Sequence, residues 1–268
     1  IAAPRGEAKS TFVSLFFVLW AVLTGRKHYI LIIADALEQA ASLLGAVKDE
    51  LEFNEALKRD FPGAGKGHVW NVGTVVTPGN VKIQALGAGK RMRGLRHGPH
   101  RPDLIVLDDL ENDGNVDKPE QRDKLQSWLQ KTVLNLGAAD GSMDVVYVGT
   151  LLHYDSVLAR TLRKPLWKAR TFRSILRWPD RMDLWDEWES LLSSRGEAEA
   201  RRFYRQHRVK MEAGAEVSWP ASRPLYRLMC LRAEDREAFD SEQQNDPLSA
   251  NEAPFNGCIT FWVDRSRD

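Results

Sequence analysis

The chain has few cysteines, no strong excess of charge of one sign, and no apolar run long enough to cross a membrane. Its 268 residues include two cysteines, Cys230 and Cys258, which show neither zinc-ligand spacing nor the density of a disulfide framework and fit a reducing cytoplasm. The net charge of +1 gives no overall electrostatic reason to bind nucleic acid, so any basic surface must be local. A composition of 43% hydrophobic and 28% charged residues is that of a folded globular protein.

The longest apolar run, Phe12–Leu23, is about twelve residues long, whereas a membrane-spanning helix needs about twenty. Because Arg5 and Lys9 precede it, the run also resembles a secretory signal. However, the following segment, Leu23–Lys27, lacks a cleavage site of small residues and is basic. We therefore predict a buried helix and no membrane partner. Since the sequence begins with Ile1 rather than methionine, we expect a fragment cut just ahead of its first motif.

That first motif is the segment Ala3–Thr11, which reads A-P-R-G-E-A-K-S-T. It approaches the phosphate-binding pattern G-x-x-x-x-G-K-[ST], with alanine at both glycine positions. In this interpretation the loop joins a short strand to a helix, Lys9 reaches the β- and γ-phosphates, and the Ser10 hydroxyl ligates Mg²⁺. A chance Lys-Ser pair near a helix start is the alternative. The predicted nucleotide-binding residues are Pro4, Arg5, Gly6, Glu7, Ala8, Lys9, Ser10 and Thr11.

A second signal lies about a hundred residues downstream, where the segment 102–111 reads P-D-L-I-V-L-D-D-L-E. Four apolar residues followed by two acids predict a buried parallel strand that delivers carboxylates to its C-terminal edge, where open α/β sheets bind ligands. A Walker B strand has this form: Asp108 holds Mg²⁺ and a neighbouring acid polarises the attacking water. Together the two motifs predict hydrolysis of ATP.

Alternating strand and helix patterns predict an α/β fold with a mostly parallel central sheet flanked by helices. Strands are expected at 28–33, within 69–86, and at 144–148, the last of these ending in Gly149-Thr150. Helices are expected at 37–60, 118–136, 185–211 and 233–243. The glycine-rich segment 61–67 opens no helix and is interpreted as a loop. The basic loop 87–101 is either a solvated surface, a phosphate or DNA contact, or the source of an arginine that acts on a nucleotide.

In this order the motifs resemble the ATPase domain of phage terminase large subunits, the motors that pump viral DNA into capsids. The resemblance rests on Ala3–Thr11, 33–40, 93–111, Val148–Thr150 and 239–247. It implies an ASCE-type P-loop NTPase fold, in which an extra strand lies between the Walker A and Walker B strands. Residues 1–154 would then form the ATPase core and 155–247 a small helical linker or lid subdomain. Residues 248–268 would be a tail or the start of a nuclease domain, whose activity we expect to be absent from this chain.

The resemblance also implies roles for single residues. Asp108 would hold the metal together with Ser10, and Arg5 would sense the γ-phosphate. Asp109 stands where many terminases have the catalytic glutamate, and Glu111 is an alternative base. Two further sets are implied: Arg96 and Arg101 as candidate arginine fingers for a neighbouring subunit, and Gly149 and Thr150 as the coupling motif.

The implied function is an ATP- and Mg²⁺-dependent motor that translocates double-stranded DNA into the procapsid. Its expected partners are the portal protein, the small terminase subunit and further copies of the chain in a ring, in the cytoplasm of the infected bacterial host. The alternative is a degenerate P-loop protein that binds nucleotide or acts as a scaffold without turnover, which Ala3 and Ala8 favour. A helicase is less favoured, because no set of helicase motifs follows Thr150.

Overall fold

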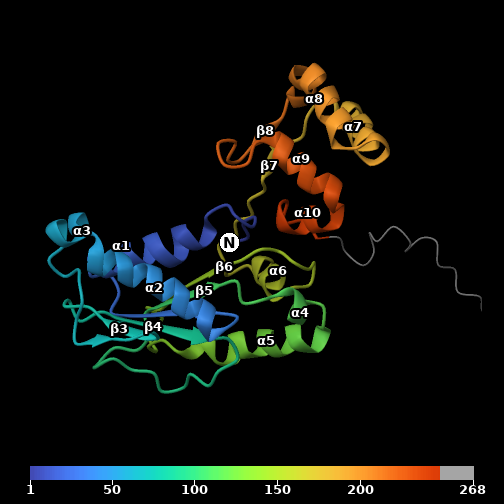
Figure 1. The fold of residues 1–268 in the computed structure, drawn as a ribbon. Helices are drawn as coiled ribbons and strands as arrows, with labels where there is room; N and C mark the ends of the chain where they lie inside the picture. The colour runs from blue at the N-terminus through green and yellow to red at the C-terminus, as the bar shows by residue number, and fades with distance from the viewer. Residues whose placement is uncertain (248–268) are drawn as a thin grey trace, which may run out of the picture.

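The computed structural model describes residues 1–247 and consists of a sheet unit followed by a smaller helical unit (Figure 1). The tail predicted at 248–268 lies outside the described residues. In Figure 1 the N-terminus lies at the junction of the two units, which places the first motif between them. None of the helices in the described part of the chain is long and apolar enough to cross a membrane.

A six-stranded sheet in the order β2-β3-β4-β1-β5-β6 forms the centre of the first unit. Four strands are parallel: β1 (Tyr29–Ala34), β4 (Lys82–Gly87), β5 (Leu104–Asp108) and β6 (Asp144–Val148). The short strands β2 (Val69–Trp70) and β3 (Thr74–Val76) are antiparallel at one edge. The sequence prediction of a mostly parallel central sheet flanked by helices is therefore confirmed.

Helices cover both faces of this sheet, which explains why β1 and β5 are continuous apolar runs without alternation (Figure 1). Ile30 and Ile32 of β1 pack in one buried cluster and Leu31 and Ile33 in the other, as expected for side chains that alternate between faces. The first face is covered by η1 (Thr11–Phe17, a π-helix), α1 (Val18–Leu23) and α2 (Leu37–Phe53). The second is covered by α5 (Pro119–Lys131), η2 (Val133–Asn135) and α6 (Val157–Leu162).

The chain start continues the sheet beyond β6. Ala2 forms parallel bridges with Gly149, just after β6, and with Thr171 on its other side. Its neighbours add backbone hydrogen bonds, with Ala3 N–H donating to Gly149 and Ala2 N–H to Arg170, each at 2.9 Å. Strand β6 thus lies between the segment that precedes the first motif and strand β5, which ends at Asp108.

The second unit has its own core. It contains β7 (Ile175–Arg177), α7 (Met182–Arg195), α8 (Glu197–Glu212), β8 (Glu216–Val217), α9 (Leu225–Glu234) and α10 (Arg236–Glu242). Trp185 and Trp188 are fully buried at its centre with their rings at 74° and their centroids 5.5 Å apart. Their spacing of three residues places both tryptophans on one face of α7.

Several elements differ from the sequence expectation. The helix expected at 185–211 is divided at Gly196 (φ 85°) into α7 and α8, and the short helix α4 (Asp113–Val116) was not predicted. The helix expected at 37–60 is broken at Asn54, whose side chain accepts hydrogen bonds from Ala56 and Leu57 N–H and begins a second helix, α3 (Glu55–Asp60). Helix α9 was not predicted. Helix α6 belongs by sequence to the 155–247 subdomain, yet it packs against the sheet, and the second core begins only at Ile175.

Candidate nucleotide-binding site

The loop Ala3–Thr11 has the backbone of an anion cradle. Gly6 (φ 79°) and Ala8 (φ 56°) are both left-handed, and the N–H groups of Gly6, Ala8 and Lys9 have no hydrogen-bond partner among the described residues. Left-handed residues that alternate with right-handed ones turn successive N–H groups toward one concave side. Ala8 adopts this conformation in place of the glycine of the P-loop pattern, at a cost of about 1 kcal/mol.

The loop leads directly to the acids of β5. Lys9 Nζ lies 3.1 Å from Asp109 Oδ2, and the lysine side chain is only 9% exposed. The Ser10 hydroxyl donates to Asp108 at 3.0 Å, and the Ser14 hydroxyl, one helical turn further on, donates to the other Asp108 oxygen. The structure therefore brings the basic motif and the acidic strand end together at one edge of the sheet.

Asp108 is fully buried at the end of β5. Burial raises the pKa of its carboxyl group, and the hydrogen bonds from Ser14 and Ser10 oppose this effect by stabilising the ionised form. The Coulombic repulsion of Asp109 raises this pKa further, while the Lys9 ammonium lowers it. The two hydroxyls and the lysine thus favour a charged carboxylate where burial alone would favour a neutral acid.

Glu111 has a different environment. Its carboxylate accepts hydrogen bonds from the N–H groups of Val157 (2.7 Å) and Leu158 (3.0 Å) in the first turn of α6, and from the Tyr147 hydroxyl (3.2 Å). Burial raises its pKa and these hydrogen bonds lower it. Because both oxygens are engaged, Glu111 fastens the loop after β5 to α6 and is less free than Asp109 to accept a proton.

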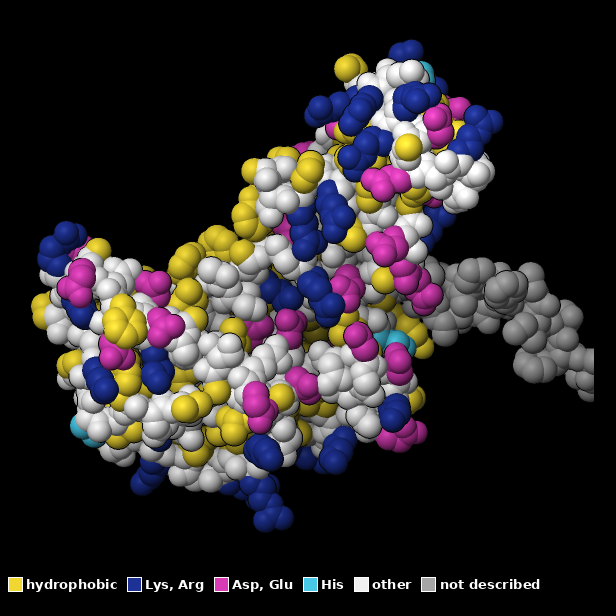
Figure 2. Space-filling view, in the orientation of Figure 1, with side chains coloured by type: hydrophobic (Ala, Val, Ile, Leu, Met, Phe, Trp, Pro, Cys, Tyr) yellow, Lys and Arg dark blue, Asp and Glu magenta, His cyan; other side chains and the backbone are white. Residues whose placement is uncertain are grey.

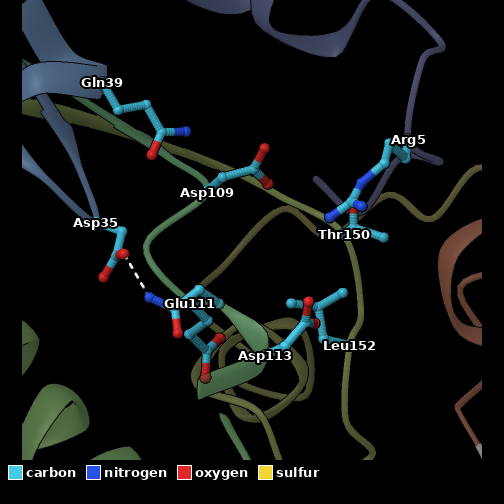
Figure 3. Close-up of a pocket in the computed structure, with 9 residues that line it drawn as sticks. Arg5, Asp35, Gln39, Asp109, Glu111, Asp113, Thr150 and Leu152 are labelled. Atoms are coloured by element: carbon cyan, nitrogen blue, oxygen red, sulfur yellow. Dashed lines mark hydrogen bonds between the residues drawn. The ribbon is translucent and has the colours of Figure 1, made fainter. Parts of the chain in front are cut away.

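A hollow of about 170 Å³ lies beside this site (Figure 3). Most of its charged lining is acidic: Asp35, Asp109, Glu111 and Asp113, with Arg5 the one cation among its lining residues. Asp35 accepts a hydrogen bond from Asn112 at 2.5 Å, drawn as the dashed line in Figure 3. Figure 2 shows acidic side chains gathered at the junction of the two units, with basic ones directly above them. The acidic lining fits a metal ion and water better than a bare anion.

The predicted coupling residues adjoin these groups. The Thr150 hydroxyl donates to the carbonyl of Ala3 at 3.2 Å, at the start of the loop. At Gly149, an added Cβ would lie 3.3 Å from Asp109 Oδ1 and 3.1 Å from the Leu158 side chain of α6. Because Gly149 has no side chain, Asp109 and α6 can both lie close to it. A larger residue at this position would clash with one of them.

Three residues of the motif contact the second unit. The Arg5 guanidinium pairs with Glu242 at 3.0 Å, and Glu7 accepts hydrogen bonds from the hydroxyls of Ser174 (3.0 Å) and Ser218 (2.8 Å). Gly6 lies so close to Arg223 that an added Cβ would be 2.0 Å from its Nη2. Of the other predicted residues, Pro4 accepts from Glu7 N–H in the loop's turn, and Thr11 begins η1 with its side chain exposed.

The structure does not bring Arg96 and Arg101 to this site. Both are exposed, in the loop whose residues 97–103 lie against the starts of β1 and β4: His100 stacks on His28, and His97 contacts Asn80. Asp108 lies at the opposite, C-terminal end of β5. A role for either arginine in a neighbouring subunit stays a prediction.

The donor set suits magnesium. Mg²⁺ prefers oxygen ligands and is held by one or two protein groups together with water and phosphate oxygens. Ser10 and Asp108 offer a hydroxyl and a carboxylate side by side. No cluster of three or more histidine, cysteine or acidic residues fit to hold a metal by itself occurs within residues 1–247. The residues present therefore fit a metal that is shared with a bound triphosphate.

Sequence reasoning missed two contributors. Ser14 lies four residues after Ser10 and so on the same helix face, a spacing that could have identified it. Arg223 is more than two hundred residues from the loop, in a segment that contains no recognisable motif. No sequence pattern connects the two.

Comparison with known proteins gives a limited result. No protein family and no curated protein matches the chain. Among solved structures, the chain is similar to the crystal structure of the HK97 bacteriophage large terminase, with 16% sequence identity and a TM-score of 0.44. The similarity covers 78% of this chain and 42% of that one, so the chain spans less than half of that terminase.

Proposed function

We propose that the chain hydrolyses ATP with Mg²⁺, using the loop Ala3–Thr11 to bind the phosphates. The observation that carries this proposal is the meeting of Lys9 and Ser10 with Asp109 and Asp108 at one strand end. Phosphoryl transfer to water requires a lysine, a hydroxyl and two carboxylates around a loop whose N–H groups can bind an anion. The N–H groups of Gly6, Ala8 and Lys9 have no partner in the described part of the chain.

Each residue has a distinct role in this proposal. The loop N–H groups and Lys9 would bind the phosphates, and Ser10 and Asp108 would hold a Mg²⁺ ion, which would supply positive charge to the phosphate oxygens. Asp109 accepts the proton of the attacking water once the triphosphate draws Lys9 away from it. The Ser14 hydroxyl favours the ionised form of Asp108, and Glu111 holds α6 in place behind the site.

We further propose that this ATPase is the motor part of a phage terminase large subunit that translocates double-stranded DNA. The sequence resemblance supports this, as does the direct attachment of the loop to the second unit through Arg5 and Glu7, which offers a route from phosphate to movement. Basic side chains of that unit, among them Arg201, Arg202 and Arg205, would contact DNA phosphates without sequence preference. The portal protein, the small terminase subunit, a ring of copies and the infected host's cytoplasm belong to the same proposal.

The test is phosphate release from Mg·ATP, with and without double-stranded DNA, by the parent chain and by Lys9→Ala and Asp108→Ala. We expect turnover that DNA stimulates in the parent and its loss, by at least about 100-fold, in both variants. Turnover unchanged in either variant would contradict the assignment of the site. Turnover that is lost in both variants but does not respond to DNA would support the ATPase and contradict the motor.

A binding protein without turnover is the second candidate, because Lys9 is engaged by the very carboxylate proposed as the base. The double variant Asp109→Ala/Glu111→Ala distinguishes the two. Equal ATP affinity in parent and variant, with no hydrolysis by the parent, would select the binding protein.

A further inference from the structure

The second unit places an arginine on the phosphate loop. The guanidinium of Arg223 lies against Gly6, so close that an added Cβ would be 2.0 Å from Nη2 and 2.8 Å from Cζ. Gly6 is also left-handed, at φ 79°, a backbone conformation that favours glycine. Arg223 therefore touches the part of the loop between Ala3 and Ala8 that closes around an anion.

The charge of this arginine is not neutralised within the described chain. Arg223 Nη1 donates to the neutral amide of Gln243, at 2.5 Å, and no carboxylate of residues 1–247 lies within 4.0 Å of its guanidinium. The two other cations of the loop are both paired, Arg5 with Glu242 and Lys9 with Asp109. Arg223 is thus the cation at this loop that has no acidic partner among the described residues.

Its position is fixed by neighbouring structure. The Arg223 N–H donates to the carbonyl of Trp219 in a turn, and Pro224 is the N-cap residue of α9. Gln243 is 6% exposed, and its Oε1 also accepts a hydrogen bond from Ser174, whose hydroxyl reaches Glu7 of the loop. This network holds a half-buried guanidinium over the loop, and some of its donors have no partner within residues 1–247.

We infer that Arg223 is a phosphate-binding residue, supplied by the second unit to the nucleotide held in the loop of the same chain. The inference rests on the proposed function, because it assigns a further ligand of the proposed triphosphate site. A guanidinium offers planar, paired donors that match phosphate oxygens, and its charge adds to that of Lys9. A bound phosphate would then be held by groups of both units.

The test is calorimetric titration of the full chain with Mg·ATP, Mg·ADP and AMP, comparing the parent with Arg223→Ala, Arg223→Gln and Arg223→Lys. Arg227→Ala, an exposed arginine on the adjoining turn of α9, is the matched control. We expect Arg223→Ala and Arg223→Gln to weaken Mg·ATP binding by about 10-fold or more. AMP binding should change little in either variant, Arg223→Lys should restore part of the loss, and Arg227→Ala should match the parent.

The outcomes separate this inference from the function it rests on. Mg·ATP affinities of Arg223→Ala and Arg223→Gln equal to the parent's, with Lys9→Ala deficient, would overturn the inference and leave the proposed function standing. Equal losses for ATP and AMP would also overturn it, because they would indicate a structural defect. A parent chain that binds no Mg·ATP would overturn both. If thermal unfolding shows that Arg223→Ala does not fold, Arg223→Gln and Arg223→Lys decide the matter.

Discussion

Lys9 Nζ and Asp109 Oδ2 lie 3.1 Å apart, although the two residues are one hundred positions apart in the chain. The lysine is 9% exposed and the aspartate 30%, so the pair is screened more weakly than a surface ion pair. A buried lysine needs such a partner when no phosphate is bound. The pair therefore joins the loop Ala3–Thr11 to the C-terminal end of β5.

The first prediction concerns which acid is the base. Asp109→Asn should lower ATP hydrolysis by about 100-fold or more while Mg·ATP still binds, because the amide cannot accept the proton. Glu111→Gln keeps an oxygen for α6 and should retain most of the activity. Steady-state hydrolysis and nucleotide titration of both variants check this. A larger loss of turnover in Glu111→Gln than in Asp109→Asn would assign the base to Glu111 instead.

The second prediction concerns pH. The Ser14 hydroxyl lowers the pKa of Asp108 by hydrogen bonding to its ionised form, so Ser14→Ala should raise that pKa. Since metal binding needs the carboxylate, the acidic limb of the pH–activity profile should move to higher pH. Activity well above that limb should be nearly that of the parent. Ser14→Thr, which keeps the hydroxyl, is the control and should retain the parent profile. An unmoved acidic limb in Ser14→Ala would show that this hydrogen bond does not tune Asp108.

The third prediction is a gain of stability. Burial raises the folded pKa of Asp108 above its ordinary value of 3.8, so the folded chain binds this proton more tightly than the unfolded chain. Its contribution to stability is therefore largest below pH 3.8 and falls as the pH rises through the folded pKa. At neutral pH the charged form opposes folding, and Asp108→Asn should stabilise the nucleotide-free chain by about 1 kcal/mol.

Asp109→Asn is the matched control for this stability effect. It removes the partner of the buried Lys9 and should lower the melting temperature rather than raise it. Thermal unfolding of the three proteins at pH 7 measures both effects. A lower melting temperature for Asp108→Asn than for the parent would mean that Lys9, Ser10 and Ser14 outweigh the cost of burying the carboxylate.

The sheet and one side of the site could be predicted from the sequence because both depend on local patterns. Runs such as Ile30–Ile33 and Leu104–Leu107 are apolar without alternation, which is the pattern of strands buried on both faces. The C-terminal ends of parallel strands lie at the same edge of the sheet. Acids at the end of β5 therefore lie close to a loop that follows another parallel strand. Asp108 and Asp109 therefore lie where the pattern placed them.

The rest could not be predicted, for physical reasons. The contact of Arg223 with Gly6 depends on how the second unit docks on the first, and docking leaves no periodic signal in the chain. The apolar spacing of α2 continues past Asn54, so the sequence pattern alone predicts one long helix. The helix ends there because the Asn54 side chain accepts hydrogen bonds from the first N–H groups of α3 instead. Arg96 and Arg101 were predicted from the basic character of their loop and from the family resemblance, and neither carries information about the edge of the sheet at which a loop lies.

The last prediction concerns the core of the second unit, where two neighbouring tryptophans differ in one hydrogen bond. Trp185 Nε1 donates to the carbonyl of Met211 at 2.8 Å, whereas Trp188 Nε1 is buried without a partner in the described part of the chain. Trp185→Phe leaves the Met211 carbonyl without this donor, but Trp188→Phe removes an unpaired N–H. Since both rings are fully buried and lose similar volume, the difference between the variants should reflect the hydrogen bond. We expect Trp188→Phe to be less destabilising than Trp185→Phe by about 1–2 kcal/mol in urea unfolding monitored by circular dichroism. Equal losses would mean that packing alone sets the stability of the unit that holds Arg223 against Gly6.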